Sequence, residues 1–334
     1  MKITKAVVRR MSLDFKVGFR TSFGLSTTKD FSIVELHDSD GNVGYGACSA
    51  FMRPWYNEET TMGALFVIKE YLIPSLFEAG DFKDPEWFFD HTSWIRRNRM
   101  ARASVDCALW ELYSKELGIP EYKALGGVRN EIEAGVSLGI EDTPDKLLHT
   151  IEKYMAQGYR RVKCKIKPGY DINYLRAVRK EYGDIMLMVD ANSAYTLDDI
   201  DLFKEMDELG LLMIEQPLAS DDIVDHRHLQ QSIQTPVCLD ESIDSVDDAR
   251  RAIELGINIK VARVGGLTEA RRIQKFAGER GVFSWCGGMV DDGVARGHNM
   301  AVATLPYYKY PNDIPGSDRY YADDIVTPST YIDS

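Results

Sequence analysis

The sequence predicts an α/β barrel preceded by a smaller α+β unit, and two observations carry that prediction. From Glu131 onward, short apolar, β-branched runs alternate with helical patterns, as expected for a parallel sheet built from strand–helix units. Asp190, Glu215 and Asp240 follow one another at intervals of 25 residues, about the length of one strand, loop, helix and return loop. The 334 residues suffice for a barrel of about 250 residues and a second, smaller domain.

The first unit, residues 1–126, shows strand patterns followed by helical ones. Asp40-Gly41 between two alternating runs is a strong hairpin signal, and Gly118 ends the last helical pattern. We expect strands at 3–10, 31–37 and 43–48, aromatic loops at 14–26 and 50–56, and helices at 58–77, 84–91 and 99–117.

Gly126-Gly127 marks the join to the second unit, residues 127–306. Its strands are expected near 132–138, 160–166, 185–190, 211–215, 236–239, 257–261 and 282–286, with helices between them. A weaker eighth strand near 307–310 opens the last segment, 307–334, whose Tyr320, Tyr321 and Tyr331 are expected to return to the first unit. The prediction is a modified TIM barrel, (β/α)7β, with an N-terminal α+β capping domain completed by the C-terminal tail.

Composition narrows the class of protein. The net charge of −12 argues against nucleic acid or an anionic membrane as a partner. The five cysteines lie in apolar runs without a CxxC pair, which favours buried free thiols in a reducing compartment. The N-terminus has no apolar leader segment, and no run of 18 apolar residues occurs. We therefore expect a cytoplasmic enzyme with a small-molecule substrate, and the sequence leaves a homo-oligomer open.

The three equally spaced acids predict a metal site. Each follows an apolar strand directly, so Asp190, Glu215 and Asp240 should emerge side by side at one rim of the barrel. Three converging carboxylates cannot all stay ionised without a cation, and a hard divalent metal is the natural partner. Taken singly, Asp190 and Asp240 could instead be helix caps. Asn192 and Glu241 lie next to two of the acids and are expected to orient them.

Lysines flank this expected site. Lys163 and Lys165 are two residues apart on the strand at 160–166, so they share one face, and a normally apolar barrel interior places them near the open rim. Crowding of two ammonium groups lowers the pKa of at least one, which suits a general base. The alternative is an edge strand with its lysines in solvent. Lys260 ends the strand that follows the acids, although Arg263 could take its place.

These blocks, with others along nearly the whole chain, resemble the enolase superfamily, its muconate-lactonizing subgroup, and within it the o-succinylbenzoate synthase/N-acylamino acid racemase family. The motifs that carry the resemblance lie at 19–24, 54–59, 135–140, 163–169, 190–192, 215–218, 240–243, 258–260, 263–266 and 285–289.

The resemblance implies Mg2+, with Mn2+ as a substitute ion, on Asp190, Glu215 and Asp240, and catalytic amines at Lys165 and Lys260 on opposite faces of the substrate, with Lys163 beside them. The superfamily is itself a standard example of a lysine base that acts with Mg2+ on a proton α to a carboxylate, giving an enediolate. The residues that correspond to its substrate pocket are Ser137, Gly288, Met289 and Val290, with Asp291 beside them and Phe19, Phe23 and Phe51 on two capping loops.

Three departures from the family pattern concern specificity. Ala47 stands after Gly46 where the family usually has glutamate, and Val290-Asp291-Asp292 stands where an acid followed by serine or threonine is usual. The segment before Lys260 is about four residues shorter than expected, with Val261-Ala262 in place of Pro-Gly.

The leading expectation is o-succinylbenzoate synthase, a syn dehydration in menaquinone biosynthesis, with N-acylamino acid racemase activity beside it. Alternatives are a dedicated racemase, a dipeptide epimerase or a muconate-type cycloisomerase. A dipeptide epimerase needs an acidic partner for the substrate amine, and Asp291 and Asp292 keep that alternative open. The alternative from another class is a non-catalytic metal-binding barrel.

Overall fold

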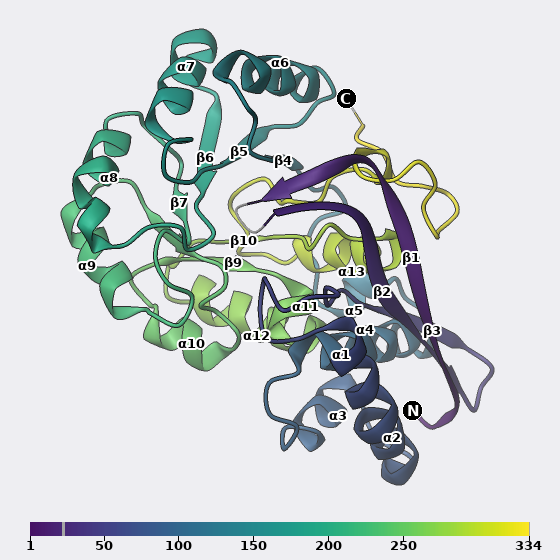
Figure 1. Ribbon diagram of the computed structural model, residues 1–334. Coiled ribbons are helices and arrows are strands. Elements are labelled where there is room, and N and C mark those ends of the chain that lie inside the picture. The colour runs from purple at the N-terminus through teal and green to yellow at the C-terminus, as the bar shows by residue number, and fades with distance from the viewer. Residues whose placement is uncertain (22–23, 334) are drawn as a thin grey trace.

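A long antiparallel hairpin opens the chain in the computed structural model, which describes residues 1–21 and 24–333, with backbone alone for 19–21 and 24. Strands β1 (Ile3–Thr21) and β2 (Gly24–Asp38) pair along their length, and β3 (Val43–Cys48) adds to β2. The loop expected at 14–26 is wrong, because after an irregularity between Asp14 and Phe19 the ladder resumes and runs to Thr21 opposite Gly24. The hairpin thus reaches over the mouth of the barrel (Figure 1).

Helices cover one face of this small sheet and complete the capping unit, by which we mean β1–β3 and α1–α5. They are α1 (Thr61–Val67), the π-helical turn η1 (Ile68–Leu72), α2 (Ile73–Ala79), α3 (Pro85–His91), α4 (Arg99–Glu116) and α5 (Glu121–Ala124). The first helix begins after Thr60, whose side chain accepts from the Gly63 amide, rather than at the expected residue 58. Helix α4 packs so closely on β3 that a Cβ at Gly46 would lie 1.9 Å from the Ser104 carbonyl oxygen.

Seven parallel strands form the barrel sheet in the order β10-β9-β8-β7-β6-β5-β4. The strands are β4 (Gly135–Leu138), β5 (Arg161–Lys165), β6 (Met186–Asp190), β7 (Ile214–Glu215), β8 (Val237–Leu239), β9 (Gly256–Ile259) and β10 (Ser284–Cys286). The helices are α6 (Pro144–Met155), α7 (Ile172–Tyr182), α8 (Ile200–Asp207), α9 (Val224–Ser232), α10 (Val246–Arg251), α11 (Val261–Val264), α12 (Leu267–Gly278) and α13 (Gly293–Ala303). The predicted modified barrel with an N-terminal capping unit is confirmed (Figure 1).

The eighth position of the barrel is filled by isolated bridges rather than by the strand expected at 307–310. Tyr308 bridges to Ser284 on one edge of the sheet, and Asn312 bridges to Ala134 on the other. Pro311 lies between them and has no backbone N–H to donate, which limits a continuous ladder here.

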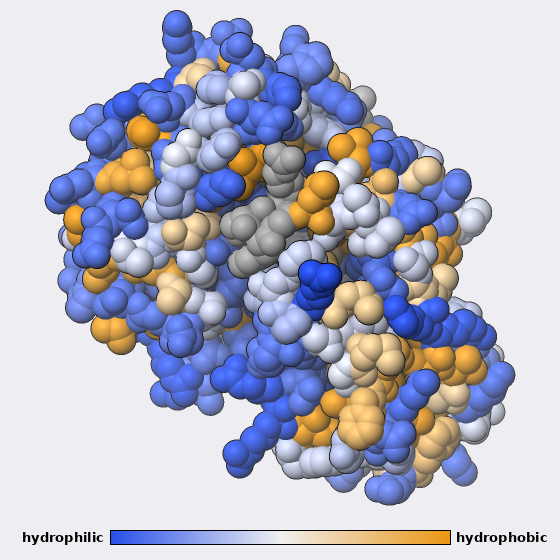
Figure 2. Space-filling model, in the orientation of Figure 1, coloured by the Kyte–Doolittle hydropathy of each residue, from blue (hydrophilic) through white to orange (hydrophobic). Residues whose placement is uncertain are grey.

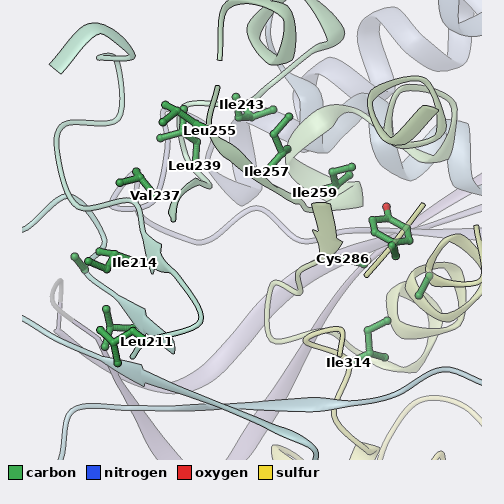
Figure 3. Packing of buried hydrophobic residues seen from close by; sticks show 14 of the residues in the cluster. Leu211, Ile214, Val237, Leu239, Ile243, Leu255, Ile257, Ile259, Cys286 and Ile314 are labelled. Atoms are coloured by element: carbon green, nitrogen blue, oxygen red, sulfur yellow. The ribbon is translucent and has the colours of Figure 1, made fainter. Parts of the chain in front are cut away.

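Alternation along the strands separates the core from the site. Ile257 and Ile259 of β9 point outward into the main core, as do the labelled residues of β7, β8 and β10 (Figure 3). Asn258, between them, points to the barrel interior, where its side chain reaches Glu215. By the same alternation Cys164 lies in the outer core, between the inward-facing Lys163 and Lys165. All five cysteines are buried and free.

The tail packs along the hairpin. Tyr321 bridges to Phe15 of β1, and the Lys16 amide donates to the Tyr320 carbonyl at 2.8 Å. Arg296 of α13 fixes the following turn by an ion pair of 2.6 Å with Asp324. Tyr331 does not take part in this packing as expected, because it is 69% exposed.

The surface is mostly polar over the barrel helices, and apolar residues gather over the end of the capping unit that carries α1 and α2 (Figure 2). Met62, Phe66 and Phe77 are exposed there. No helix in the described part of the chain combines the length and the apolar character that a membrane span requires.

His298 joins the barrel to the capping unit. Its Nδ1 lies 2.9 Å from Glu121 Oε1 in α5, and its Nε2 lies 2.9 Å from the Tyr45 carbonyl oxygen in β3. Burial lowers the pKa of His298, but Glu121 more than offsets this effect and the pKa rises to about 9. The imidazolium of α13 therefore donates to two elements of the capping unit, α5 and β3, at neutral pH.

We expect His298→Gln to lower the thermal midpoint most at low pH. The folded pKa of about 9 lies above the unfolded value of about 6.5, so the stabilisation is fully present below pH 6.5 and is lost as pH rises through 9. It amounts to at most roughly 3 kcal/mol. Midpoints measured at pH 6, 7.5 and 9.5 should approach those of the parent protein as pH rises. His149→Gln, at a side chain that is 84% exposed, is the control, and a constant difference for His298→Gln would contradict the ion pair.

Candidate active site

The site lies at the carboxyl ends of neighbouring barrel strands. Lys165 of β5 is paired in register with Asp190 of β6, and Asp190 with Glu215 of β7. Glu215 is opposite Cys238 of β8, and Asp240 follows two residues later. Because the carboxyl ends of parallel strands meet at one edge, this register brings the three acids and Lys165 to one rim.

Two lysines of β5 hold the first pair of carboxylates together. The Lys163 ammonium lies 2.9 Å from Glu215 Oε2 and 3.6 Å from Asp190 Oδ2. Lys165 donates to Asp190 Oδ2 at 2.9 Å, and Asn258 donates to the other oxygen of Glu215 at 2.6 Å. The expectation that both lysines turn toward the rim is therefore met.

Asp240 collects positive charge from the opposite side. Its Oδ2 lies 2.7 Å from the Lys260 ammonium, and its Oδ1 accepts from Arg263. Tyr56, on the capping loop, also donates to Oδ1 at 3.2 Å. Lys260 and Arg263, between which the sequence did not decide, thus both reach the same carboxylate. The shortened segment before Lys260 leaves this residue at the end of β9, where α11 begins.

Asn192 and Glu241 connect the two halves of the rim. The Asn192 amide donates to Asp190 Oδ1 at 3.0 Å, and its side-chain oxygen accepts from Lys165. Its side-chain nitrogen donates to Glu241 Oε1 at 3.0 Å. Asn192 adopts a left-handed backbone conformation with φ of 43°, which asparagine tolerates better than most residues.

The carboxyl groups of the rim differ in pKa. Against the effect of burial, nearby lysines lower the pKa of Asp190, and Lys260 and Arg263 lower that of Asp240. Burial raises the pKa of Glu215 to about 7, and neighbouring Asp190 and Asp240 add to the rise while Lys163 opposes it. Burial and the same two aspartates raise the pKa of Glu241 to about 8. The lowered pKa expected from crowded lysines is wrong for Lys163, because burial lowers it but Glu215, Asp313 and Asp190 outweigh burial and raise it.

The donor set suits a hard divalent cation. Asp190, Glu215 and Asp240 provide carboxylate oxygens at one buried rim. Across 1–21 and 24–333, no three acidic, histidine or cysteine side chains are grouped closely enough to hold a metal ion. Lysine and arginine donors instead take up the carboxylate oxygens at this rim. Such oxygens are the ligands that Mg2+ prefers, so the residues fit the predicted ion.

A cavity of about 100 Å³ opens beside this rim, between the barrel and the capping unit. Of the predicted substrate residues, those lining it are Phe51, Ser137, Gly288, Met289, Val290 and Asp291. The side chain of Phe19 and all of Phe23 lie outside the described residues. Phe15, Trp55, Tyr56, Ile314 and Tyr320 add apolar and aromatic surface that the sequence did not assign to the pocket.

The acids in the pocket wall are already engaged by the protein. Asp291 Oδ2 accepts from the Met289 amide at 3.0 Å and from Asn299 at 2.8 Å. Asp313 Oδ2 accepts from Ser137 at 2.6 Å and lies 3.2 Å from the Lys163 ammonium. Burial raises the pKa of Asp313, but Lys163 and other donors outweigh it and lower the pKa to about 2.

Asn258, Tyr56 and Asp313 contact the site, but the sequence analysis did not assign them to it. Asn258 is two residues before Lys260 on the same strand, so strand alternation could have placed it beside Glu215. Tyr56 and Asp240 are 184 residues apart, and Asp313 follows the weak eighth strand, so neither has a local pattern that points to the site. Ala47, which stands where the family usually has glutamate, is buried in an apolar cluster with Phe31 and Ile33.

Comparison with known families agrees with this geometry. Residues 3–126 match the mandelate racemase/muconate lactonizing enzyme N-terminal domain, and residues 146–333 match the enolase C-terminal domain-like family. The chain belongs to the enolase superfamily.

Named relatives place it further within the superfamily. An o-succinylbenzoate synthase from Geobacillus kaustophilus is 49% identical over 336 residues, with coverage of 99% of this chain and 89% of the relative. An N-succinylamino acid racemase from Thermus thermophilus is 42% identical over 330 residues, with coverage of 98% and 89%. A crystal structure of a superfamily member from Listeria innocua has a TM-score of 0.96 at 41% identity, with coverage of 100% and 91%. The predicted family is confirmed, and the chain is an enzyme of this superfamily.

We expect Glu215→Gln to weaken Mg2+ binding by about 100-fold or more, because it removes one of three charged ligands, whereas changes to outer partners cost about 10–100-fold. Isothermal titration calorimetry measures the affinity. Glu205→Gln is the matched control, since Glu205 is a half-exposed carboxylate paired with Arg176 on the outer helices. Unchanged Mg2+ affinity in Glu215→Gln would remove this carboxylate from the metal site.

Proposed function

We propose that the protein is an o-succinylbenzoate synthase that removes a proton α to a carboxylate and expels a β-hydroxyl as water. The observation that carries the proposal is the placement of two amines on the two sides of one carboxylate cluster. Lys165 contacts Asp190 and Lys260 contacts Asp240, and both lysines line the same cavity. The name of the relative that is 49% identical agrees with this reaction.

Asp190, Glu215 and Asp240 would hold Mg2+, which when bound supplies charge that stabilises the developing negative charge on the substrate carboxylate. Lys165 would remove the α-proton and return it to the leaving hydroxyl. Lys163 would keep its proton and balance charge, since its pKa is raised by Glu215, Asp313 and Asp190 against the effect of burial. Burial lowers the pKa of Lys260 but Asp240 more than offsets this effect, so neutralising Asp240 would lower the pKa of this amine, as a general base requires.

The pocket favours a substrate with an uncharged acyl or ring body. Phe15, Phe51, Met289 and Tyr320 present apolar or aromatic surface. A dipeptide substrate carries a free ammonium that needs an unengaged acid. Asp291 is bound to the amide of Met289 and to Asn299, which argues against the dipeptide epimerase alternative.

A second activity, racemisation of N-succinylamino acids, follows from the same arrangement. If Lys260 delivers a proton to the face opposite Lys165, the configuration at the α-carbon inverts. The Lys260 ammonium is held by Asp240 and lies 4.9 Å from the Tyr56 ring centre, at the far side of the cluster from Lys165. The relative from Thermus thermophilus carries the name of this activity.

We expect Lys165→Ala to lower dehydration and α-proton exchange on the order of 1,000-fold, because the general base is lost. Formation of o-succinylbenzoate is followed by absorbance, and exchange of an N-succinylamino acid is followed by NMR in D2O with Mg2+. Mg2+ affinity should remain. Lys167→Ala, two residues further along and outside the cavity lining, is the matched control and should keep full activity.

Lys260→Ala separates the two reactions. Exchange of one enantiomer at Lys165 should persist while racemisation is lost. Unchanged exchange in Lys165→Ala would take Lys165 out of the mechanism. Intact Mg2+ binding with no turnover of either substrate by the parent protein would overturn the proposed function.

A further inference from the structure

Val290, in the wall of the cavity, has a backbone conformation that needs outside support. Its φ of 58° lies in the left-handed region, where a β-branched residue is a genuine outlier. It follows Gly287-Gly288-Met289 after β10, and Gly288 through Asp291 all line the cavity. The shape of this wall therefore depends on whatever fixes Val290.

Two donors from outside the barrel strands hold the Val290 carbonyl. The Lys29 ammonium, from β2 of the capping unit, donates to this oxygen at 2.9 Å. The Tyr321 hydroxyl, from the tail, donates to the same oxygen at 2.7 Å. Because an accepted hydrogen bond fixes the direction of a carbonyl, two donors together fix the peptide plane between Val290 and Asp291.

Lys29 is paired with an acid that sits directly beyond this wall. Both the Lys29 and the Asp292 side chains are fully buried, and Lys29 Nζ lies 3.6 Å from Asp292 Oδ2. The other oxygen of Asp292 caps α13 by accepting from the amides of Val294 and Ala295. Oδ2 has no hydrogen-bond partner among the described residues, so Lys29 is its nearby cation. Buried charges are tolerated when they are paired, and this pair anchors Lys29 beside the wall.

We propose that Lys29 is a positioning residue that sets the acyl-group specificity of the pocket by holding Val290 in its left-handed conformation. The proposal rests on the proposed function for its choice of substrates. Lys29 does not touch the metal-binding carboxylates or the amines of the rim in any described contact. Its effect should therefore fall on substrate fit, with Mg2+ binding left intact.

The decisive variant is the double substitution Lys29→Met with Asp292→Asn. It removes both buried charges together, and asparagine can still cap α13. Lys29→Met alone leaves Asp292 buried without its cation and should lower the thermal midpoint, which the double variant should largely restore. Tyr321→Phe removes the second donor to Val290. Lys16→Met is the matched control, since exposed Lys16 of the same hairpin donates to the tail at the Asp318 carbonyl, away from the cavity.

For the double variant we expect KM for an N-succinylamino acid to rise about tenfold, with kcat within about threefold. The ratio of kcat/KM for N-succinyl over N-acetyl derivatives of one amino acid should change at least about fivefold. Tyr321→Phe should shift the ratio in the same direction. A double variant that has a near-parental midpoint, KM and ratio would overturn the proposal, as would a ratio that changes in Tyr321→Phe but not in the double variant.

Hydrogen exchange of the amides at 288–292 provides a readout that does not depend on the reaction. The double variant should exchange faster there than the parent protein, with Lys16→Met unchanged. If the parent protein turns over neither substrate, the proposed function fails, and this measurement still decides the role of Lys29. Parental exchange rates in the double variant would overturn it.

Discussion

Charge balance at a buried rim governs the rest of this molecule. Asp190, Glu215 and Asp240 are each at most 1% exposed, and neighbouring carboxylates in such a place repel one another. Cations contact these carboxylates from two directions: the lysines of β5 lie on one side, and Lys260 and Arg263 lie on the other. In the proposed site, a divalent cation would replace some of these contacts and leave the amines around it available for chemistry.

Strand alternation explains why much of this could be predicted. In β5 the inward residues are polar and the outward residues are apolar, so parity placed Lys163 and Lys165 at the rim, whereas Lys260 was left undecided against Arg263. Equal spacing predicted the three acids. Strand alternation would also have predicted Asn258, which is two residues before Lys260 and donates to Glu215. The barrel and the rim were thus encoded locally, in a few residues per strand.

The walls of the cavity were not encoded in this way. Tyr56 reaches Asp240 across 184 residues, and Lys29 reaches Val290 across 261 residues. No periodicity links such positions, because the contacts arise only when the capping unit closes on the barrel. The length of the β1–β2 hairpin was predicted too short for a related reason. Its glycine-rich far end suggested a loop, whereas cross-strand pairing continues to Thr21.

Two segments that lie far apart in the sequence are neighbours in the folded protein. Phe15 of β1 has Tyr321 as its bridge partner, and both rings stack at a centroid distance of 5.6 Å. During synthesis on the ribosome, β1 emerges well before this partner, because all the barrel strands lie between them in the sequence. The cavity, which Phe15 and Tyr320 both line, can therefore be completed only after all the barrel strands have been synthesised.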